Sequence, residues 1–375
     1  MSTTTKVIEE IKDLLNEEKW TRQTIDNYTK KDFVKLDDII EKSFTENYAE
    51  ELREECINHL KSSSRSIIAL YIAGIISLEE DLVDDTYIYQ VIQLFQNNDK
   101  YALVEFLAEK VLEYGENKIA LEVLKDCYEY EENEEELVKI WERLVRIDHQ
   151  NGEIPKLLAE KNENEGNLDI SIHYYKTAIR RYIKNGNLAQ TENLWRKLVD
   201  MIPDDIDFFY SIEKDIAKKS PEKASELLTL LSDYYTNKNN IDRAIEILKK
   251  IMVYTNQNKE ARNKIVECLS IKYKNHSQLD KYIKISKINQ TWKNFQDALD
   301  EFQKHIAFDV GNIVFHKSWK IGRIVKIEEE NFTIDFETKK NHTMTLQMAL
   351  KSLEVLPEDH IWIVKRQERD KLRDD

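Results

Sequence analysis

The segment "GENKIALEVLKDCYEY" at residues 115–130 indicates a repeated helical architecture, because two later segments repeat its pattern. These are "GNLDISIHYYKTAIRR" at 166–181 and "NNIDRAIEILKKIMVY" at 239–254. Each opens on Gly or Asn, reaches a small residue five positions later, and continues with apolar residues at helical spacing. The small residues are Ala120, Ser171 and Ala244. A small residue lets a partner helix approach closely while larger side chains fill the seam, so the pattern predicts stacked helical hairpins.

The fragments "ALEVL" and "AIEIL", with the turns before them, resemble the second helix of tetratricopeptide-type repeats. That family repeats about every 34 residues, whereas the small residues here are 51 and 73 positions apart. The units are therefore divergent or separated by extra helices. A chain with only seven Gly and four Pro suits helices joined by tight turns. We predict a mostly α protein with an α-solenoid over residues 1–307.

Two further segments match, "LVKIWERLVRID" at 137–148 and "TENLWRKLVDMI" at 191–202, and they place Trp141 and Trp195 in register. These indoles could line a peptide groove, but a position in the seam between helices is the favoured interpretation. The acidic run "EYEENEEE" at 129–136 could dock a basic partner. A solvated turn is favoured, with Glu residues near the N-terminus of the next helix.

Residues 1–100 read as helical without a visible repeat. The apolar stretch "SIIALYIAGIIS" at 66–77 is too short to cross a bilayer and predicts a buried helix. The N-terminus has no apolar region behind a basic start, so no secretory signal is expected. Cys56, Cys127 and Cys268 are too far apart for a C-x-x-C site and are expected to be core thiols. A cytoplasmic protein without membrane contact is predicted.

The charge of the chain is unevenly placed. The formal net charge is −15, and only 12 of the 56 Lys and Arg and 13 of the 71 Asp and Glu residues follow residue 307. The helical part therefore holds nearly all of the excess negative charge. Because such a surface repels a phosphate backbone, nucleic acid is expected as a partner only beyond residue 307.

The hydrophobic period changes near residue 308. The stretches "NIVFH", "GRIVKI" and "FTIDF" alternate between two faces, with Phe332, Ile334 and Phe336 on one side, and "TMTL" at 343–346 adds a short strand. Strands this short bury a core by curling on themselves, so 308–357 predicts a small SH3-like barrel. Residues 358–375 then predict a charged C-terminal helix that could lead to a further domain.

No catalytic signature is present. The sequence has no G-x-x-x-x-G-K-[ST], G-x-G-x-x-G, H-E-x-x-H or G-x-S-x-G motif, and its eight histidines are scattered. We predict a protein that is not an enzyme and uses no cofactor, metal or small-molecule substrate.

The predicted barrel carries a concentration of positive charge beside an aromatic residue. The candidate partner-binding residues are His316, Lys317, Trp319, Lys320, Arg323 and Lys326. They suit an acidic peptide or a nucleic acid, but "EEE" at 328–330 neutralises the unit, so a protein partner is favoured. Phe315, Phe332 and Phe336 could suggest a methyl-lysine cage, although alternating strand positions favour a barrel core.

Residues 311–336 resemble the Tudor-like barrel of several bacterial proteins that bind RNA polymerase. In that pattern, G-x-x-V-x-H-x-x-F-G-x-G-x-V, Trp319 stands where Phe is usual and Lys320 replaces the first of the paired glycines, which puts the turn in question. The matching positions are Gly311, Val314, His316 and Gly322, with Ile324 for the last Val and "IDF" at 334–336 as the later strand.

The stretch "HTMTLQMALKSLEVLPEDHIWI" at 342–363, behind a helical array, resembles the N-terminal part of the long, fused form of the Gre-type transcription elongation factor. The resemblance implies an accessory part that docks on RNA polymerase through the barrel, while the solenoid binds another protein. The Gre coiled coil with its acidic tip is not found, so transcript cleavage by this chain alone is not expected. Two alternatives stay open: a nucleic-acid-binding barrel, and a tetratricopeptide-type peptide-binding scaffold unrelated to transcription.

Overall fold

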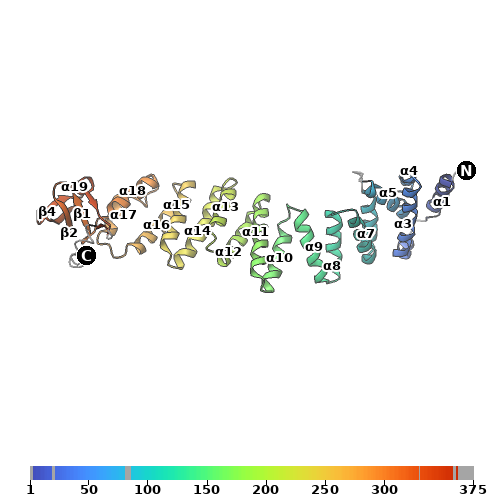
Figure 1. Cartoon of the computed structure of the whole chain (residues 1–375), viewed down its shortest axis with the longest axis horizontal. Helices are drawn as coiled ribbons and strands as arrows, with labels where there is room; N and C mark the ends of the chain where they lie inside the picture. The colour runs from blue at the N-terminus through green and yellow to red at the C-terminus, as the bar shows by residue number, and fades with distance from the viewer. Residues whose placement is uncertain (1–2, 19–21, 81–85, 329, 358–359, 362–375) are drawn as a thin grey trace, which may run out of the picture. The chain divides into compact units, whose positions relative to one another are not determined.

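A computed structural model describes residues 3–18, 22–80, 86–328, 330–357 and 360–361. The chain divides into two compact units, residues 1–185 and 186–375. The first contains helices, and the second combines helices with a five-stranded sheet (Figure 1). The boundary after residue 307 stays a prediction, and the helix predicted over 358–375 lies almost wholly outside the described residues.

Helices in the first unit pack mainly against their neighbours in sequence, which is the arrangement of a solenoid. They are α1 (Thr3–Glu17), α2 (Arg22–Asn27), α3 (Lys30–Thr45), α4 (Ala49–Leu60), α5 (Ile67–Glu79), α6 (Thr86–Gln96), α7 (Tyr101–Glu113), α8 (Lys118–Tyr130), α9 (Glu134–Ile147), α10 (Glu153–Asn164) and α11 (Leu168–Asn185). The apolar helix α5 is buried along most of its length, as predicted. A Cβ on its Gly74 would lie 2.7 Å from the backbone nitrogen of Ile88, so glycine permits the close approach of α6.

The second unit continues the helical array and adds a short helix within the sheet region. Its helices are α12 (Leu188–Met201), α13 (Ile206–Ala217), α14 (Pro221–Asn237), α15 (Ile241–Tyr254), α16 (Lys259–Lys272), α17 (Leu279–Ser286), α18 (Phe295–Ile306) and α19 (Leu346–Ser352). Polar side chains begin these helices: the Ser220 hydroxyl accepts from the backbone of Lys223 ahead of Pro221, and Asn240 caps α15 in the same way.

The predicted hairpins are confirmed. The three repeated segments form α8, α11 and α15, which pack against α7, α10 and α14 respectively. Their small residues, Ala120, Ser171 and Ala244, are fully buried where the partner helix passes. Extra helices explain the long spacing: α9 lies between the first two hairpins in sequence, and α12 and α13 lie between the second and third.

The small β unit is an antiparallel sheet of strands β1 (Ile313–His316), β2 (Lys320–Glu328), β3 (Asn331–Phe336), β4 (His342–Thr345) and β5 (Leu353–Val355). The strand order is β4-β3-β2-β1-β5. In sequence, α19 connects β4 to β5. As predicted, Phe332, Ile334 and Phe336 share a buried face, while Thr333 and Asp335 point to the other side. An irregularity between Ile324 and Lys326 shifts the β2–β3 register.

The sheet rests on the last helical hairpin. The Tyr282 hydroxyl of α17 donates a hydrogen bond of 3.2 Å to the carbonyl oxygen of Phe308, and the Phe308 and Phe332 ring centres are 5.8 Å apart. The Ser277 hydroxyl donates to the Asp309 carboxylate at 2.6 Å. These contacts fix the chain where it passes from helix to strand.

Candidate protein-interaction sites

Trp319 is the centre of an aromatic cluster at one end of the sheet. Its ring stacks on His316 with 4.0 Å between ring centres and contacts His342 at 4.1 Å. Phe336 supports the cluster from the core, 5.4 Å from Trp319. The Lys339 ammonium lies 5.2 Å from the Trp319 ring centre. The half-buried indole is therefore held between two imidazoles and covered by a cation.

The turn before β2 sets the position of this indole. The Nδ1 atom of His316 accepts hydrogen bonds from the backbone nitrogens of Ser318 at 3.1 Å and Trp319 at 3.3 Å. Lys320 adopts a left-handed conformation with φ of 63°, a region in which glycine is favoured. Lys320, which replaces a glycine of the resembled pattern, therefore occupies a conformation that glycine adopts more readily.

Gly322 is required by packing rather than by backbone conformation. A Cβ at this position would lie 2.5 Å from the Phe336 ring and 2.9 Å from a methyl group of Ile334. The absence of a side chain at Gly322 leaves room for the ring of Phe336, and that ring also packs against Trp319. Contact with Phe336 and Ile334 therefore explains why this chain has glycine at position 322, where the resembled pattern also has one.

The predicted cations of the sheet do not form a single group. Lys317 and Lys320 are exposed, with no ion pair to a carboxylate among the described residues. Arg323 donates to the Gly311 carbonyl oxygen at 3.2 Å, and Lys326 pairs with Glu328 at 2.5 Å. The structure therefore places Lys317 and Lys320 beside the His316–Trp319 stack, whereas Lys326 is neutralised along its own strand.

Sequence reasoning missed two members of the cluster, His342 and Lys339. Lys339 lies in the connection between β3 and β4 and His342 is the first residue of β4, 20 and 23 residues after Trp319 in sequence. Burial, followed by the charges of Lys339 and His316, lowers the pKa of His342 below its usual value. No local pattern in the sequence indicates that these residues meet Trp319, because the contact depends on strand pairing.

Strands β4 and β5 are the two edges of the sheet over the described residues. An edge strand presents backbone donors and acceptors to which a strand of another chain can add. His342 begins β4 and also contacts Trp319. One edge and the aromatic cluster therefore lie side by side.

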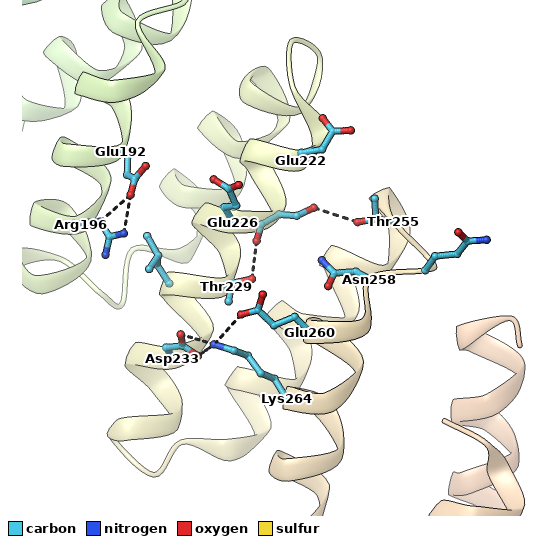
Figure 2. Close-up of a pocket in the computed structure, with 13 residues that line it drawn as sticks. Glu192, Arg196, Glu222, Glu226, Thr229, Asp233, Thr255, Asn258, Glu260 and Lys264 are labelled. Atoms are coloured by element: carbon cyan, nitrogen blue, oxygen red, sulfur yellow. Dashed lines mark hydrogen bonds and ion pairs between the residues drawn. The ribbon is translucent and has the colours of Figure 1, made fainter. Parts of the chain in front are cut away.

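A groove of about 660 Å³ lies on the helices of the second unit. Figure 2 shows Glu192 and Arg196 on α12, Glu226 and Asp233 on α14, and Glu260 and Lys264 on α16. Its charged lining is mostly acidic: Glu192, Glu222, Glu226, Asp233 and Glu260 against Arg196 and Lys264.

Ion pairs connect the helices that form this groove. The Lys264 ammonium lies 2.5 Å from the Asp233 carboxylate, joining α16 to α14. Lys223 of α14 pairs with Glu192 of α12, and Lys223 and Arg196 together lower the pKa of Glu192. Glu226 also pairs with Lys223 and Glu260 with Lys264, so Glu222 is the one acidic lining residue without an ion pair in the part of the chain that the structure describes. The pairs of Asp233 and Glu192 connect neighbouring helices, and acidic side chains outnumber basic ones along the groove.

The two tryptophans of the solenoid differ in environment. Trp195 is fully buried and contacts Phe209 at 5.0 Å between ring centres, which agrees with a seam position. Trp141 is half-buried and lines a smaller groove of about 440 Å³ between α9 and α10.

The acidic run at 129–136 leads into helix α9. Asn133 caps α9, Glu134 to Glu136 occupy its first turn, and Lys139 pairs with Glu136 at 2.7 Å. This geometry is that of a helix start with its own local ion pair.

The three cysteines, possible metal-ligand groups and possible membrane-spanning helices were the remaining candidate features. Cys56, Cys127 and Cys268 are buried free thiols, and burial raises the pKa of Cys56 and Cys127 to about 12. Among the described residues, no group of three His, Cys, Asp or Glu side chains is placed to hold a metal ion. In the same part of the chain, no helix combines the length and apolar character needed to cross a membrane.

Comparison with known proteins confirms the resemblance to the Gre-type factors. The chain is 42% identical over 339 residues to a GreA-associated domains protein of Treponema pallidum, covering 90% of this chain and 51% of that protein. It is 34% identical over 362 residues to a transcription elongation factor GreA of Borreliella burgdorferi, covering 96% of this chain and 40% of that protein. The chain thus spans about half or less of the length of these relatives. No family model matches it.

Solved structures with partial likeness are helical repeat proteins. The MamA protein is 15% identical, with 60% of this chain and 94% of that chain covered and a TM-score of 0.23. A tetratricopeptide repeat protein from Parabacteroides merdae is 14% identical, with 60% and 98% covered and a TM-score of 0.24. At these TM-scores the likenesses carry no argument about fold or partners.

Proposed function

We propose that this chain is a non-enzymatic, accessory part of a transcription elongation factor that works in the cytoplasm. In this proposal the five-stranded sheet docks on RNA polymerase and the helical array serves as a scaffold for a further protein. The relationship to GreA-named proteins over most of the chain supports the place in transcription. The chain spans only part of those relatives, so docking, and not the activity of the whole factor, is what we propose for it.

The observation that carries the docking proposal is the half-buried, firmly held indole of Trp319 with the exposed Lys317 and Lys320 beside it. The indole is fixed by His316 and His342, and Lys317 and Lys320 extend beside it without carboxylate partners among the described residues. A rigid aromatic anchor with neighbouring cations is typical of protein-binding hot spots. The adjacent edge strand β4 can accept an added strand from the polymerase. The similarity of 311–336 to polymerase-binding Tudor-like barrels supports the same assignment.

The scaffold role is supported by the acidic groove on α12, α14 and α16. Its volume suits an extended peptide, and its charge favours Lys- or Arg-containing segments. The ion pairs between the helices keep the groove in shape without a ligand. This role is compatible with docking through the sheet, because the two surfaces use different residues.

Binding of the full chain to core RNA polymerase from the same organism tests the docking proposal. Biolayer interferometry at 0.05 and 0.15 M salt is expected to give micromolar or tighter affinity. The variant Lys317→Glu with Lys320→Glu is expected to weaken binding at least about 10-fold through charge repulsion. The matched control Lys304→Glu with Lys351→Glu changes the same net charge at exposed positions of the same unit and is expected to bind normally.

Two outcomes contradict the proposal. Absence of binding at either salt concentration rules out polymerase docking and leaves the groove as the functional surface. Equal weakening by both double variants shows a net-charge effect rather than a contact at Trp319. The alternative, a nucleic-acid-binding sheet, predicts instead that a labelled oligonucleotide binds the sheet with a steep salt dependence that disappears in the Lys317→Glu, Lys320→Glu variant.

A further inference from the structure

The charge of the helical array changes sign locally at residues 271–293. This stretch has six lysines and one acidic residue, Asp280, in a chain of net charge −15. The net charge summed over residues 1–307 conceals this reversal, because the rest of the helical part is strongly acidic. A charge count over a short window would have found it.

Lys272 pairs with Asp242 and Lys293 with Glu301, and the other four lysines of this stretch have no ion pair to a carboxylate among the described residues. Lys274 follows α16, and the other three belong to α17 and its C-cap. Lys281 and Lys284 are three positions apart and share one face of the helix. Lys287 follows as the C-cap, in a left-handed conformation with φ of 56°. Lys284 and Lys287 are exposed and Lys281 is half-buried.

An exposed tryptophan adjoins these lysines. Trp292 is 68% exposed, and the Lys287 ammonium lies 5.1 Å from the centre of its ring. Such exposure is unusual for this residue type, which is highly buried on average. The exposed indole offers a flat aromatic face on which a planar group of a ligand can stack.

The buried Arg262 holds the loop that carries Trp292 through hydrogen bonds to its backbone. Arg262 donates to the carbonyl oxygen of Ile288 at 2.9 Å and to that of Lys293 at 2.7 Å, at the two ends of the loop. Ile288 is fully buried, and the backbone of Phe295 donates to the Asn256 side chain at 2.8 Å. Trp292 is therefore displayed on a loop that is already ordered, which lowers the entropy cost of binding a ligand.

We propose that Lys281, Lys284, Lys287 and Trp292, the α17 patch, bind single-stranded nucleic acid. The lysines neutralise successive phosphates and the exposed indole stacks on an unpaired base, the combination that single-strand binding surfaces use. An acidic protein segment would use the lysines but gain less from a flat, exposed aromatic face. The negative charge elsewhere on the chain is screened beyond about 8 Å at physiological salt. The local patch therefore determines the contact.

The proposal does not rest on docking of the sheet to RNA polymerase. Fluorescence anisotropy of a labelled 15-nucleotide uridine oligomer with the full chain, from 0.05 to 0.2 M salt, tests it directly. We expect Lys284→Glu with Lys287→Glu to weaken binding at least about 10-fold and to reduce the salt slope by about 1.4, the value for two lost phosphate contacts. Trp292→Ala is expected to weaken binding about 5- to 150-fold, while Trp292→Phe retains most of the affinity.

A matched control separates the patch from net charge. Lys214→Glu with Lys218→Glu makes the same charge change at two exposed positions, one in α13 and one at its C-cap, and is expected to leave the affinity unchanged. The proposal is overturned by absence of binding at 0.05 M salt, by equal loss in the control variant, or by loss only with Lys317→Glu and Lys320→Glu. It is also overturned if a glutamate-rich peptide binds at α17 while the oligomer does not, which would assign the surface to an acidic protein.

Discussion

The guanidinium of Arg262 donates a hydrogen bond of 2.9 Å to the carbonyl oxygen of Ile288, 26 residues further along the chain, and both residues are fully buried. The same guanidinium also donates to Asn256 and Lys293 carbonyl oxygens. Arg181 has the same role in the first unit, where it donates to the carbonyl oxygens of Val145, Asp148 and Asn151. In both units a buried arginine connects irregular chain between helices, satisfying carbonyl groups that the helices leave unpaired.

Replacing Arg262 is expected to destabilise the second unit. Arg262→Met keeps the apolar stem but leaves several buried carbonyl oxygens without donors, at a cost of about 2 to 4 kcal/mol. Hydrogen exchange over residues 256–295 and the urea midpoint measure the effect. Arg243→Met, which removes an exposed arginine paired with Glu246, is the control and is expected to change stability by less than about 0.5 kcal/mol. A loss of similar size in both variants would show that Arg262 has no special role.

A methyl group at Gly322 is expected to disrupt the sheet. The new Cβ would lie 2.5 Å from the Phe336 ring, so Gly322→Ala should cost about 1 to 3 kcal/mol through overpacking. Hydrogen exchange of the Val314 and Ile324 amides reports on the sheet. Combining Gly322→Ala with Phe336→Leu relieves the clash, so the double variant should be more stable than the sum of the single effects. Strict additivity would argue against the contact.

Glycine at position 320 is expected to stabilise the sheet. Lys320 is left-handed, a conformation that costs a residue with a Cβ about 1 kcal/mol more than glycine. Lys320→Gly should therefore raise stability by roughly 0.5 kcal/mol after the larger chain entropy of glycine is included. Lys317→Gly, at a nearby position outside the left-handed region, should not stabilise the sheet. The same exchange experiment compares them, and stabilisation by both would refute the conformational explanation.

The sheet is expected to lose stability in acid. The folded-state pKa of His342 is lowered, so the unfolded chain binds its proton more readily. The contribution is fully present above neutral pH and is lost as the pH falls through 6.5, the ordinary value, toward the lower folded value. Histidine NMR titration should give a pKa below 6.5 for His342, and His342→Gln should flatten the pH dependence of sheet stability between pH 5 and 8. A pKa at or above 6.5 would contradict this.

Much of the fold follows from local patterns. Ala120, Ser171 and Ala244 indicate packed helices, because a small residue within an apolar helical pattern lets a partner helix approach closely. The alternation of apolar and polar residues around Ile334 indicates a strand with one buried face. Local patterns predict only part of the site around Trp319. His316, Lys317, Trp319 and Lys320 lie on one turn and can be read together, whereas His342 and Lys339 join them only through strand pairing.

Periodicity and neighbouring side chains were enough to predict which segments are helix or strand, where the acidic excess lies and which residues share the turn at Trp319. Packing was needed to show that Trp195 is buried while Trp141 lines a groove, that Lys326 pairs with Glu328 while Lys317 and Lys320 have no carboxylate partner among the described residues, and that the exposed Trp292 lies beside Lys287. Exposure depends on which distant segments pack against a side chain, and even residues close in sequence meet only when the folded backbone brings their side chains together.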